Sequence, residues 1–242
     1  MLLDLKMEKT MIVGIMQPYF VPYIGYWQLL NAVDKYVIFD DVNYINRGWI
    51  NRNRILLNNS PHYFNITMIG ASQNKLINEI EINNDDKLVN KNLKMITGAY
   101  RKAPYYDNVY PLIEEIINCK EKNMASFISN SIYLICEYLD INSDIVISSM
   151  IDKNCNLKGQ DKIIEICKLL KATEYYNAIG GRELYSKDKF ENNGIKLKFL
   201  KTSNITYKQF NEKFNANLSI IDVMMFNSID NIKEMLDMYV LV

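Results

Sequence analysis

The first part of the chain alternates between apolar runs and short polar breaks in an order that predicts strand, turn, helix and strand. Residues 11–16 have the length and composition of a buried strand, and Gln17-Pro18 ends it because proline cannot donate to a sheet ladder. Pro22 suits the first turn of a helix. The apolar positions that would share one face of this helix are Ile24, Trp27, Leu30 and Ala32. With a second apolar run at 36–39, the chain begins as a β-α-β unit.

The same alternation returns in the second half of the chain. Strand-like runs cover residues 145–149, 174–178 and 195–200, and helical periodicity covers 157–170, 184–190, 220–226 and 229–240. Two more short strands are expected at 63–68 and 79–82. Alternating strands and helices predict an α/β fold, with a mostly parallel sheet flanked by helices.

Helical periodicity dominates the middle of the chain. It covers residues 85–100, 110–119 and 125–139, with Asp85 as a helix start and Ala103-Pro104 as an interruption. We therefore expect a helical insertion at about residues 85–140. It would lie within a single α/β domain spanning 11–242, preceded by an N-terminal extension at 1–10. Turns are expected at the asparagine pairs 58–59, 83–84 and 192–193, since asparagine tolerates left-handed backbone.

Charge and cysteine content narrow the function classes. The chain has 28 basic and 28 acidic residues, so its formal charge of zero disfavours nonspecific binding to nucleic acid or to an anionic membrane. Residues 1–10 contain Asp4 and Glu8 and no continuous apolar core, which is unlike a signal peptide, and cytoplasmic residence is expected. The cysteines show neither close pairing nor zinc spacing and read as reduced core thiols, so no metal site is expected; they are Cys119, Cys136, Cys155 and Cys167.

Polar side chains follow the first two predicted strands. In an open α/β sheet, ligands bind outside the carboxyl ends of the strands, which is where Gln17, Asp40 and Asp41 would lie. The aspartates could accept hydrogen bonds from sugar hydroxyls, bind a cation or hold a substrate amine. Since adjacent strand residues point to opposite faces, one of the two would face the cleft. The competing interpretation is that one of them caps the next turn.

A long basic and aromatic loop at 42–54 comes next. Its arginines can bind phosphate or carboxylate in bidentate fashion, and its tryptophan can stack on a base or a sugar. A nucleotide-linked anion is therefore the expected ligand, and the alternative is a surface turn whose arginines pair with nearby acids. The candidate binding residues in this loop are Arg47, Trp49, Asn51, Arg52, Asn53 and Arg54.

Other candidates are scattered along the chain. His62 is the only histidine and so a candidate base, although its setting is also that of an exposed turn. Lys94, Tyr100 and Tyr105 lie on or beside a helix end, where basic groups are also expected from the helix dipole alone. Ser148 and Ser149 would lie at the end of a strand, as ligands for phosphate or polar substrate groups or as turn formers. Ser219 with Asp222 reads as an ordinary helix cap.

Several blocks of the chain together resemble the WbqC-like protein family. The resemblance continues to Leu218-Ser219-Ile220-Ile221-Asp222 and covers nearly the whole chain from Met11. The blocks that carry it, of which the first two are the most specific, are Met16-Gln17-Pro18-Tyr19-Phe20, Pro22-Tyr23-Ile24-Gly25-Tyr26, Asp40-Asp41-Val42, Arg47-Gly48-Trp49-Ile50-Asn51-Arg52-Asn53-Arg54 and Tyr100-Arg101-Lys102-Ala103-Pro104-Tyr105.

The resemblance implies a bacterial protein of O-antigen or other surface-polysaccharide biosynthesis, where some members are proposed to be glycine transferases that acylate an amino sugar. The partners implied are a nucleotide-linked amino sugar and a glycine or glycyl-tRNA donor. Many relatives carry histidine where this chain has Met16, so an acid-base role for that histidine does not transfer. For this chemistry Asp40, Asp41 or His62 would take the proton of the amine. Gln17, Tyr19 and Trp49 would contact the substrate.

Two alternative functions remain open. The first is a noncatalytic sugar-nucleotide-binding or scaffold protein of the polysaccharide machinery. The second is a nucleotidyltransferase using ATP and Mg²⁺, because Tyr23-Ile24-Gly25-Tyr26 has the spacing of the histidine-any-glycine-histidine turn of such enzymes, with Tyr23 and Tyr26 in place of both histidines. Tyrosine can donate a hydrogen bond to phosphate but brings no positive charge.

Overall fold

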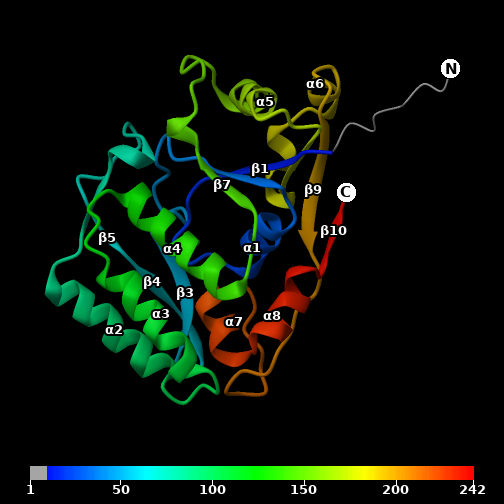
Figure 1. Cartoon of the computed structure of the whole chain (residues 1–242). Coiled ribbons are helices and arrows are strands. Elements are labelled where there is room, and N and C mark those ends of the chain that lie inside the picture. Colours follow the sequence, from blue (N-terminus) through cyan, green and yellow to red (C-terminus); the bar gives the residue numbers. More distant parts are fainter. Residues whose placement is uncertain (1–9) are drawn as a thin grey trace.

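A six-stranded, mostly parallel sheet forms the centre of the computed structural model, which describes residues 10–242 (Figure 1). The expected extension at 1–10 lies almost wholly outside the described residues. The strand order is β10-β9-β8-β1-β2-β7, and only β10 is antiparallel to its neighbour. The strands are β1 (Ile12–Met16), β2 (Lys35–Ile38), β7 (Asp144–Ile147), β8 (Glu174–Ala178), β9 (Lys196–Thr202) and β10 (Tyr239–Leu241).

Both faces of this sheet are buried, as expected for parallel strands covered by crossover helices. Along β1 and β2, alternate side chains enter two separate apolar clusters. Val13, Ile15 and Val37 pack toward α5 (Gly159–Leu169) and α6 (Lys187–Glu191), whereas Tyr36 and Ile38 pack toward α1 (Ile24–Asn31) and α8 (Ile229–Leu236). The β-α-β prediction and the α/β fold class are confirmed.

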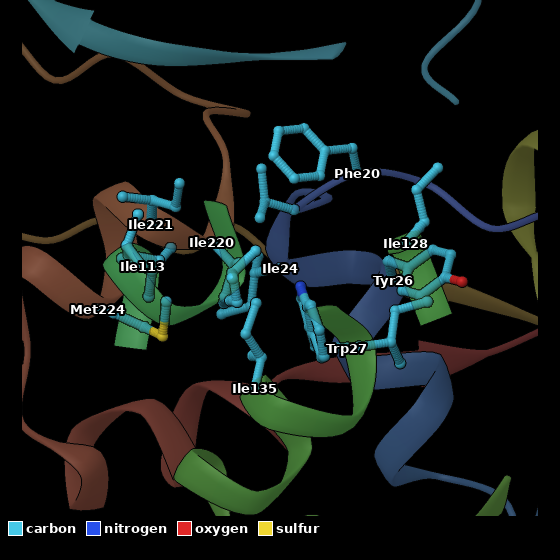
Figure 2. Packing of buried hydrophobic residues seen from close by; sticks show 14 of the residues in the cluster. Phe20, Ile24, Tyr26, Trp27, Ile113, Ile128, Ile135, Ile220, Ile221 and Met224 are labelled. Atoms are coloured by element: carbon cyan, nitrogen blue, oxygen red, sulfur yellow. The ribbon is translucent and has the colours of Figure 1, made fainter. Parts of the chain in front are cut away.

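The larger cluster is built around the first helix (Figure 2). Trp27 is fully buried there, and its indole N–H donates to the Pro22 carbonyl oxygen at 3.1 Å, so the ring carries no unsatisfied polar atom. Ile135 of α4 (Met124–Leu139) and Met224 of α7 (Ile220–Phe226) lie in the same cluster. Truncating a buried aromatic of this size generally costs about 3–5 kcal/mol. The turn before α1 is thus held by the core itself.

An insertion separates β2 from β7 in the chain. It contains the expected helical segment, α2 (Asp86–Tyr100), α3 (Tyr106–Asn118) and α4, with Asp85 capping α2 by accepting from the Leu88 amide at 2.9 Å. It also contains two hairpins, β3 (Arg52–Leu57) with β4 (Ser60–Asn65), and β5 (Thr67–Ile69) with β6 (Glu81–Asn83). Short 3₁₀ turns lie at Ile77–Glu79, Ser148–Met150 and Ile179–Leu184.

The predicted and observed elements differ most at four places, and the strand expected at 145–149 ends at Ile147, where a 3₁₀ turn begins. The single strand expected at 63–68 is two strands, and part of the loop expected at 42–54 is β3, whose paired polar side chains hide its strand character. The helix expected at 184–190 is a 3₁₀ turn followed by α6. The helix expected to run to 240 ends at Leu236, and the chain then adds β10 to the sheet edge.

Local turn and thiol predictions fared unevenly. Asn58 and Asn59 have φ of 50° and 60° between β3 and β4, which confirms the expected turn. Among the cysteines, Cys136 and Cys167 are buried, but Cys155 is exposed and Cys119 only half-buried, so the expectation of four core thiols is wrong. No helix within residues 10–242 has the length and apolar character needed to span a membrane.

Candidate functional site

The first strand lies at the point where the strand order of the sheet reverses. The chain leaves β1 toward β2 on one side, while β8 lies on the other side of β1, which creates a switch point at the carboxyl ends of β1 and β8. The segment after β1, residues 17–23, lies at this point. Tyr19 Oη lies 3.5 Å from Gln17 Oε1. Burial raises the pKa of Tyr19, and the Tyr23 and Tyr185 hydroxyls raise it further. Tyr185 comes directly after the 3₁₀ turn that follows β8.

The backbone of this segment is strained and clamped. Val21 has φ of 40°, a value that a β-branched residue adopts only when its surroundings enforce it. The Phe20 amide donates to the Ile50 carbonyl at 2.9 Å, and the Ser219 hydroxyl donates to the Val21 carbonyl at 2.6 Å. The Ile220 amide donates to the Pro22 carbonyl at 2.8 Å. Contacts from two distant parts of the chain therefore fix the conformation of residues 20–22.

A cavity of about 380 Å³ opens beside the clamped segment, and we call it the aromatic cavity. It joins residues from the turn after β1, the 42–54 loop, β3 and the segment before α7. The residues lining it are Tyr19, Pro22, Tyr23, Trp49, Asn53, Arg54 and Asn217. All except Pro22 and Asn217 belong to the set expected from the sequence to bind substrate.

Cationic and aromatic groups alternate across the exposed face of the β3–β4 hairpin and the adjoining Trp49, which precedes β3. The Arg54 guanidinium carbon lies 5.6 Å from the centre of the Trp49 ring, and the Arg52 carbon lies 4.7 Å from that of Tyr63. The centres of the Trp49 and Tyr63 rings are 6.4 Å apart. Trp49 is 42% exposed, so a ligand can reach its free surface. Such a row suits nucleobases and phosphates, which bind aromatic faces and guanidinium groups.

The arginines of the 42–54 segment are not neutralised by acidic side chains of the described residues. No ion pair within residues 10–242 involves Arg47, Arg52 or Arg54, so the alternative that they pair with nearby acids is not realised in the described part of the chain. Arg54 donates to the Asn217 carbonyl at 3.1 Å, and its buried Nε has no hydrogen-bond partner. Arg52 donates to the Gly48 carbonyl at 3.0 Å and to the Arg47 carbonyl.

A second, more open hollow of about 510 Å³ lies next to the same hairpin face. Arg47, Asn51 and Arg52 line it together with Asn46 and Tyr63. Asn51 accepts from the Tyr44 hydroxyl at 3.1 Å and donates to the Ile66 carbonyl at 3.1 Å, so it fixes the loop. The guanidinium groups of the 42–54 segment are therefore divided between two hollows.

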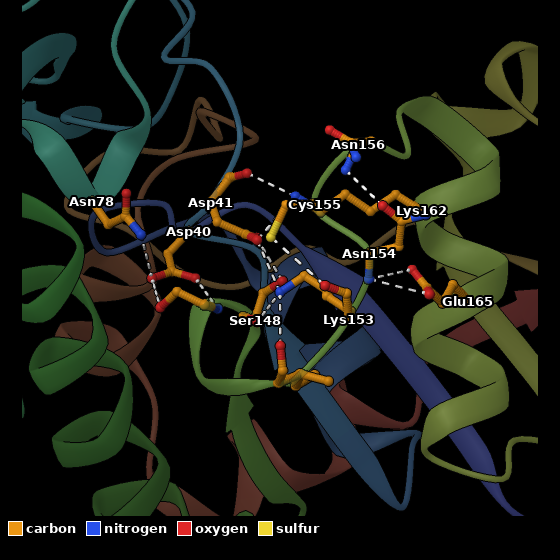
Figure 3. A network of polar contacts seen from close by, with 12 residues as sticks. Asp40, Asp41, Asn78, Ser148, Lys153, Asn154, Cys155, Asn156, Lys162 and Glu165 are labelled. Atoms are coloured by element: carbon orange, nitrogen blue, oxygen red, sulfur yellow. Dashed lines mark hydrogen bonds and ion pairs between the residues drawn. The ribbon is translucent and has the colours of Figure 1, made fainter.

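The aspartates after β2 are tied to the segment after β7 (Figure 3). Asp41 accepts from the Ser148 hydroxyl at 2.6 Å and pairs with Lys153 and Lys162 at 2.9 Å each. Burial alone would raise the pKa of Asp41, but the Ser148 and lysine contacts outweigh it, and the pKa lies below its usual value. Asp41 is therefore a carboxylate held by two nearly buried cations.

Asp40 faces away from Asp41 (Figure 3), although both residues lie beyond Ile38, the last residue of β2, and not in a strand as expected. It accepts from the Ser149 amide at 2.9 Å, from the Ser149 hydroxyl at 2.6 Å and from the Asn78 side chain at 3.3 Å. It lines a hollow of about 450 Å³ together with Asn123, Asn130 and Tyr133 among other residues. The aspartates therefore lie outside the lining of the aromatic cavity.

The other expected residues lie in different surroundings. His62 is exposed in β4 next to Tyr63, and since neighbouring strand residues point to opposite faces, it points away from the cationic and aromatic row. Tyr26 and Tyr100 are buried and can reach a ligand only through other groups. Tyr26 donates to the Gln17 carbonyl at 3.2 Å, so it supports the segment after β1. Lys94 is exposed on α2, and Tyr105 is half-buried before α3; neither lines the cavities described above.

A buried carboxylate was missed by sequence reasoning. Asp222 is fully buried and accepts from Tyr100 at 2.9 Å and from Tyr207 and Gln209 at 2.7 Å each. Burial raises its pKa, although the three hydrogen bonds oppose this. The cap prediction held for Ser219, whose hydroxyl accepts from the Ile221 amide at 3.2 Å. Asp222 instead fastens the 203–219 segment to the core, a role that no local pattern signals.

Comparison with known proteins adds two positive findings. A family model described as the WbqC-like protein family matches residues 17–234. A curated protein of Mycobacterium tuberculosis, named Uncharacterized protein Rv1507c, is 24% identical over 215 residues, which is 88% of this chain and 92% of that protein. No solved structure matches.

Proposed function

This chain belongs to the WbqC-like protein family, and from that premise we propose that it is a transferase acting on a nucleotide-activated amino sugar in bacterial surface-polysaccharide biosynthesis. The reaction is transfer of a glycyl or other acyl group to the sugar amine. The observation that carries the proposal is the aromatic cavity, where Arg54 lies beside Tyr19 and Trp49 without an acidic partner among residues 10–242.

The cavity offers groups that can bind the base and the phosphates of a nucleotide. A base stacked on Trp49 or Tyr19 gains roughly 1–3 kcal/mol, and the Arg54 guanidinium can donate to a phosphate oxygen. The Nε of Arg54 is buried and has no hydrogen-bond partner within the described chain, so one donor of this guanidinium is left unsatisfied in the absence of a ligand. A polyphosphate-linked ligand is thus supported by both the apolar and the cationic parts of the lining.

The transfer step requires a proton acceptor. The amine nitrogen attacks the acyl carbon, a C–N bond forms, the leaving group departs with the electron pair of its bond, and the nitrogen loses one proton. Asp40 is the best candidate for that proton, since Asp41 is engaged by two lysines and His62 points away from the binding face. The donor is glycyl-tRNA, or glycine activated with ATP and Mg²⁺.

One observation favours a second candidate, a noncatalytic sugar-nucleotide-binding protein. The lining of the aromatic cavity contains no carboxylate and no imidazole. A binding protein needs the guanidinium and the rings alone, whereas the transferase needs Asp40, which lines a different hollow, to reach the bound amine.

Binding is tested first, by isothermal titration with UDP and dTDP as probes. We expect Trp49→Ala and Arg54→Ala each to lower the affinity for whichever of the two nucleotides binds by about tenfold or more, because a stacking or charged contact is lost. Arg101→Ala is the matched control, because Arg101 is exposed at the end of α2 and does not line the cavity. Absence of binding by both nucleotides, or an equal effect of all three variants, would overturn the proposed site.

Turnover is tested by mass spectrometry of nucleotide amino sugars incubated with the protein, glycine, ATP and Mg²⁺, with and without charged tRNA. A protein-dependent product heavier by one glycyl residue supports the transferase, and the component whose omission abolishes it identifies the donor. Asp40→Asn, with its fold checked by circular dichroism, should lose product while it retains nucleotide affinity. Binding without any product would instead favour the noncatalytic function.

A further inference from the structure

We infer that another cavity, which adjoins the aromatic cavity and has not been described above, is the subsite for the sugar ring of the ligand. This inference rests on the proposed function. This neutral cavity has a volume of about 190 Å³ and lies between the start of α1, the end of β9 and the segment before α7. Among the residues lining it are Tyr23, Thr202, Ser203, Asn204, Tyr207 and Phe214.

The chemistry of the lining suits an uncharged ring that carries hydroxyl groups. No Asp, Glu, Lys, Arg or His lines the neutral cavity, in contrast to the aromatic cavity with its guanidinium. Hydroxyl and amide groups of Thr202, Ser203 and Asn204 can donate and accept hydrogen bonds, and the rings of Tyr207 and Phe214 give an apolar surface for C–H groups. The Asn204 side chain is exposed and makes no hydrogen bond within residues 10–242, so its amide is free for a ligand.

The two cavities are joined at a defined point. Both are lined by Tyr23 and Asn217. Asn217 has φ of 56°, and its carbonyl accepts from Arg54, so the guanidinium lies at the junction. A nucleotide-linked sugar has the same order of parts: base, phosphates, ring. With the base on Trp49 and the phosphates at Arg54, the ring is directed into the neutral cavity.

The wall of the neutral cavity is held in place before any ligand binds. Tyr207 and Gln209 both donate to the buried Asp222, and Gln209 also donates to the Asn215 carbonyl at 3.1 Å and accepts from its amide at 2.8 Å. These bonds fix an otherwise irregular segment, which reduces the entropy lost when a ligand orders it. The segment is therefore a preformed binding surface.

The test compares a nucleoside diphosphate with its hexose ester, by isothermal titration of UDP against UDP-glucose and of dTDP against dTDP-glucose. Ala216→Trp places a bulky ring on an exposed residue of the lining, so it should obstruct the neutral cavity without disturbing the core. We expect it to lower the affinity for the hexose ester by about tenfold or more and the affinity for the diphosphate by less than about twofold, since only the ester needs that space.

Asn204→Ala tests the polar contact more gently. Loss of a neutral hydrogen bond should lower the affinity for the hexose ester by roughly three- to tenfold and leave the affinity for the diphosphate unchanged. Thr206→Ala is the matched control, because Thr206 is exposed in the same segment and does not line the cavity. If Ala216→Trp leaves the ester unaffected, or weakens both ligands equally, the sugar subsite is overturned while nucleotide binding stands. If the unmodified protein binds neither ligand, the proposed function itself fails.

Discussion

At the scale of single residues, Asp41 carries the clearest electrostatic burden. Its carboxylate compensates Lys153 and Lys162, whose side chains are only 2% and 9% exposed. We expect Asp41→Asn to lower the free energy of unfolding by about 3 kcal/mol at neutral pH, because two buried ammonium groups then lose their counter-charge. Urea denaturation followed by circular dichroism measures the loss.

The same variant has a predictable pH dependence. The pKa of Asp41 is lower in the folded protein than its unfolded value, so its stabilisation is complete above about pH 4 and is lost as pH falls through the folded pKa. The stability difference between the two proteins should therefore shrink in acid. Asp140→Asn, in an exposed pair with Lys233, serves as control and should change little. A constant difference across pH would contradict the assignment.

Gly25 is required by the position of the Tyr23 ring. A Cβ at residue 25 would lie 2.5 Å from that ring and 2.7 Å from the Thr202 hydroxyl. We expect Gly25→Ala to displace Tyr23 and to lower the affinity for UDP or dTDP by about tenfold, the effect of one lost aromatic contact. Isothermal titration measures this affinity. Gly98→Ala, in the exposed part of α2 with no atom within 4 Å of its Cβ, should bind like the unmodified protein.

At the scale of elements, the start of α7 holds the strained turn after β1. Ser219→Ala removes both its cap bond to Ile221 and its bond to Val21. We expect a loss of about 2–3 kcal/mol in the free energy of unfolding, because a cap bond and a buried hydrogen bond are lost together. Ser228→Ala, which removes only the exposed cap of α8, should cost about 1 kcal/mol. Equal losses in the two variants would show that the Val21 contact contributes nothing.

The elements predicted correctly from the sequence are those whose periodicity is set by burial. β8 and α7 were predicted with their observed ends, because an apolar run or stripe fixes where each begins and stops. β3 and β10 were missed for a different reason. β3 carries Arg52 and Arg54 on its exposed face, and β10 gains its structure from pairing with β9, a contact far away in the chain.

The candidate site was predictable to a similar extent. Tyr19, Tyr23, Trp49, Asn53 and Arg54 were all expected from local sequence, and they do line one cavity. What local sequence could not give is the wall supplied by Asn217 and the separation of Asp40 from that cavity, since both depend on tertiary packing. Asp222 was missed because its partners Tyr100, Tyr207 and Gln209 come from distant segments.

At the scale of the whole molecule, the cysteines report on global opening. Burial raises the pKa of Cys136 and of Cys167 to about 12, so neither is reactive while the protein is folded. We expect iodoacetamide to modify exposed Cys155 rapidly and half-buried Cys119 more slowly. Cys136 and Cys167 should react together, at the rate of cooperative unfolding. Mass spectrometry over time measures this. Early labelling of Cys136 alone would indicate local opening of α4.

The anchoring of the 203–219 segment has an evolutionary consequence. Its side-chain attachment to the protein depends on Tyr207, Gln209 and the buried Asp222. The Ser203 amide also donates to the Met238 carbonyl at 2.9 Å, but the side chains of Ser203, Asn204 and Ala216 are exposed and take no part in these bonds. Mutations at the exposed positions change the shape of the cavity at little cost in stability. Under the proposed function, we expect relatives that keep the anchor and bind different sugars to differ mainly at these exposed positions.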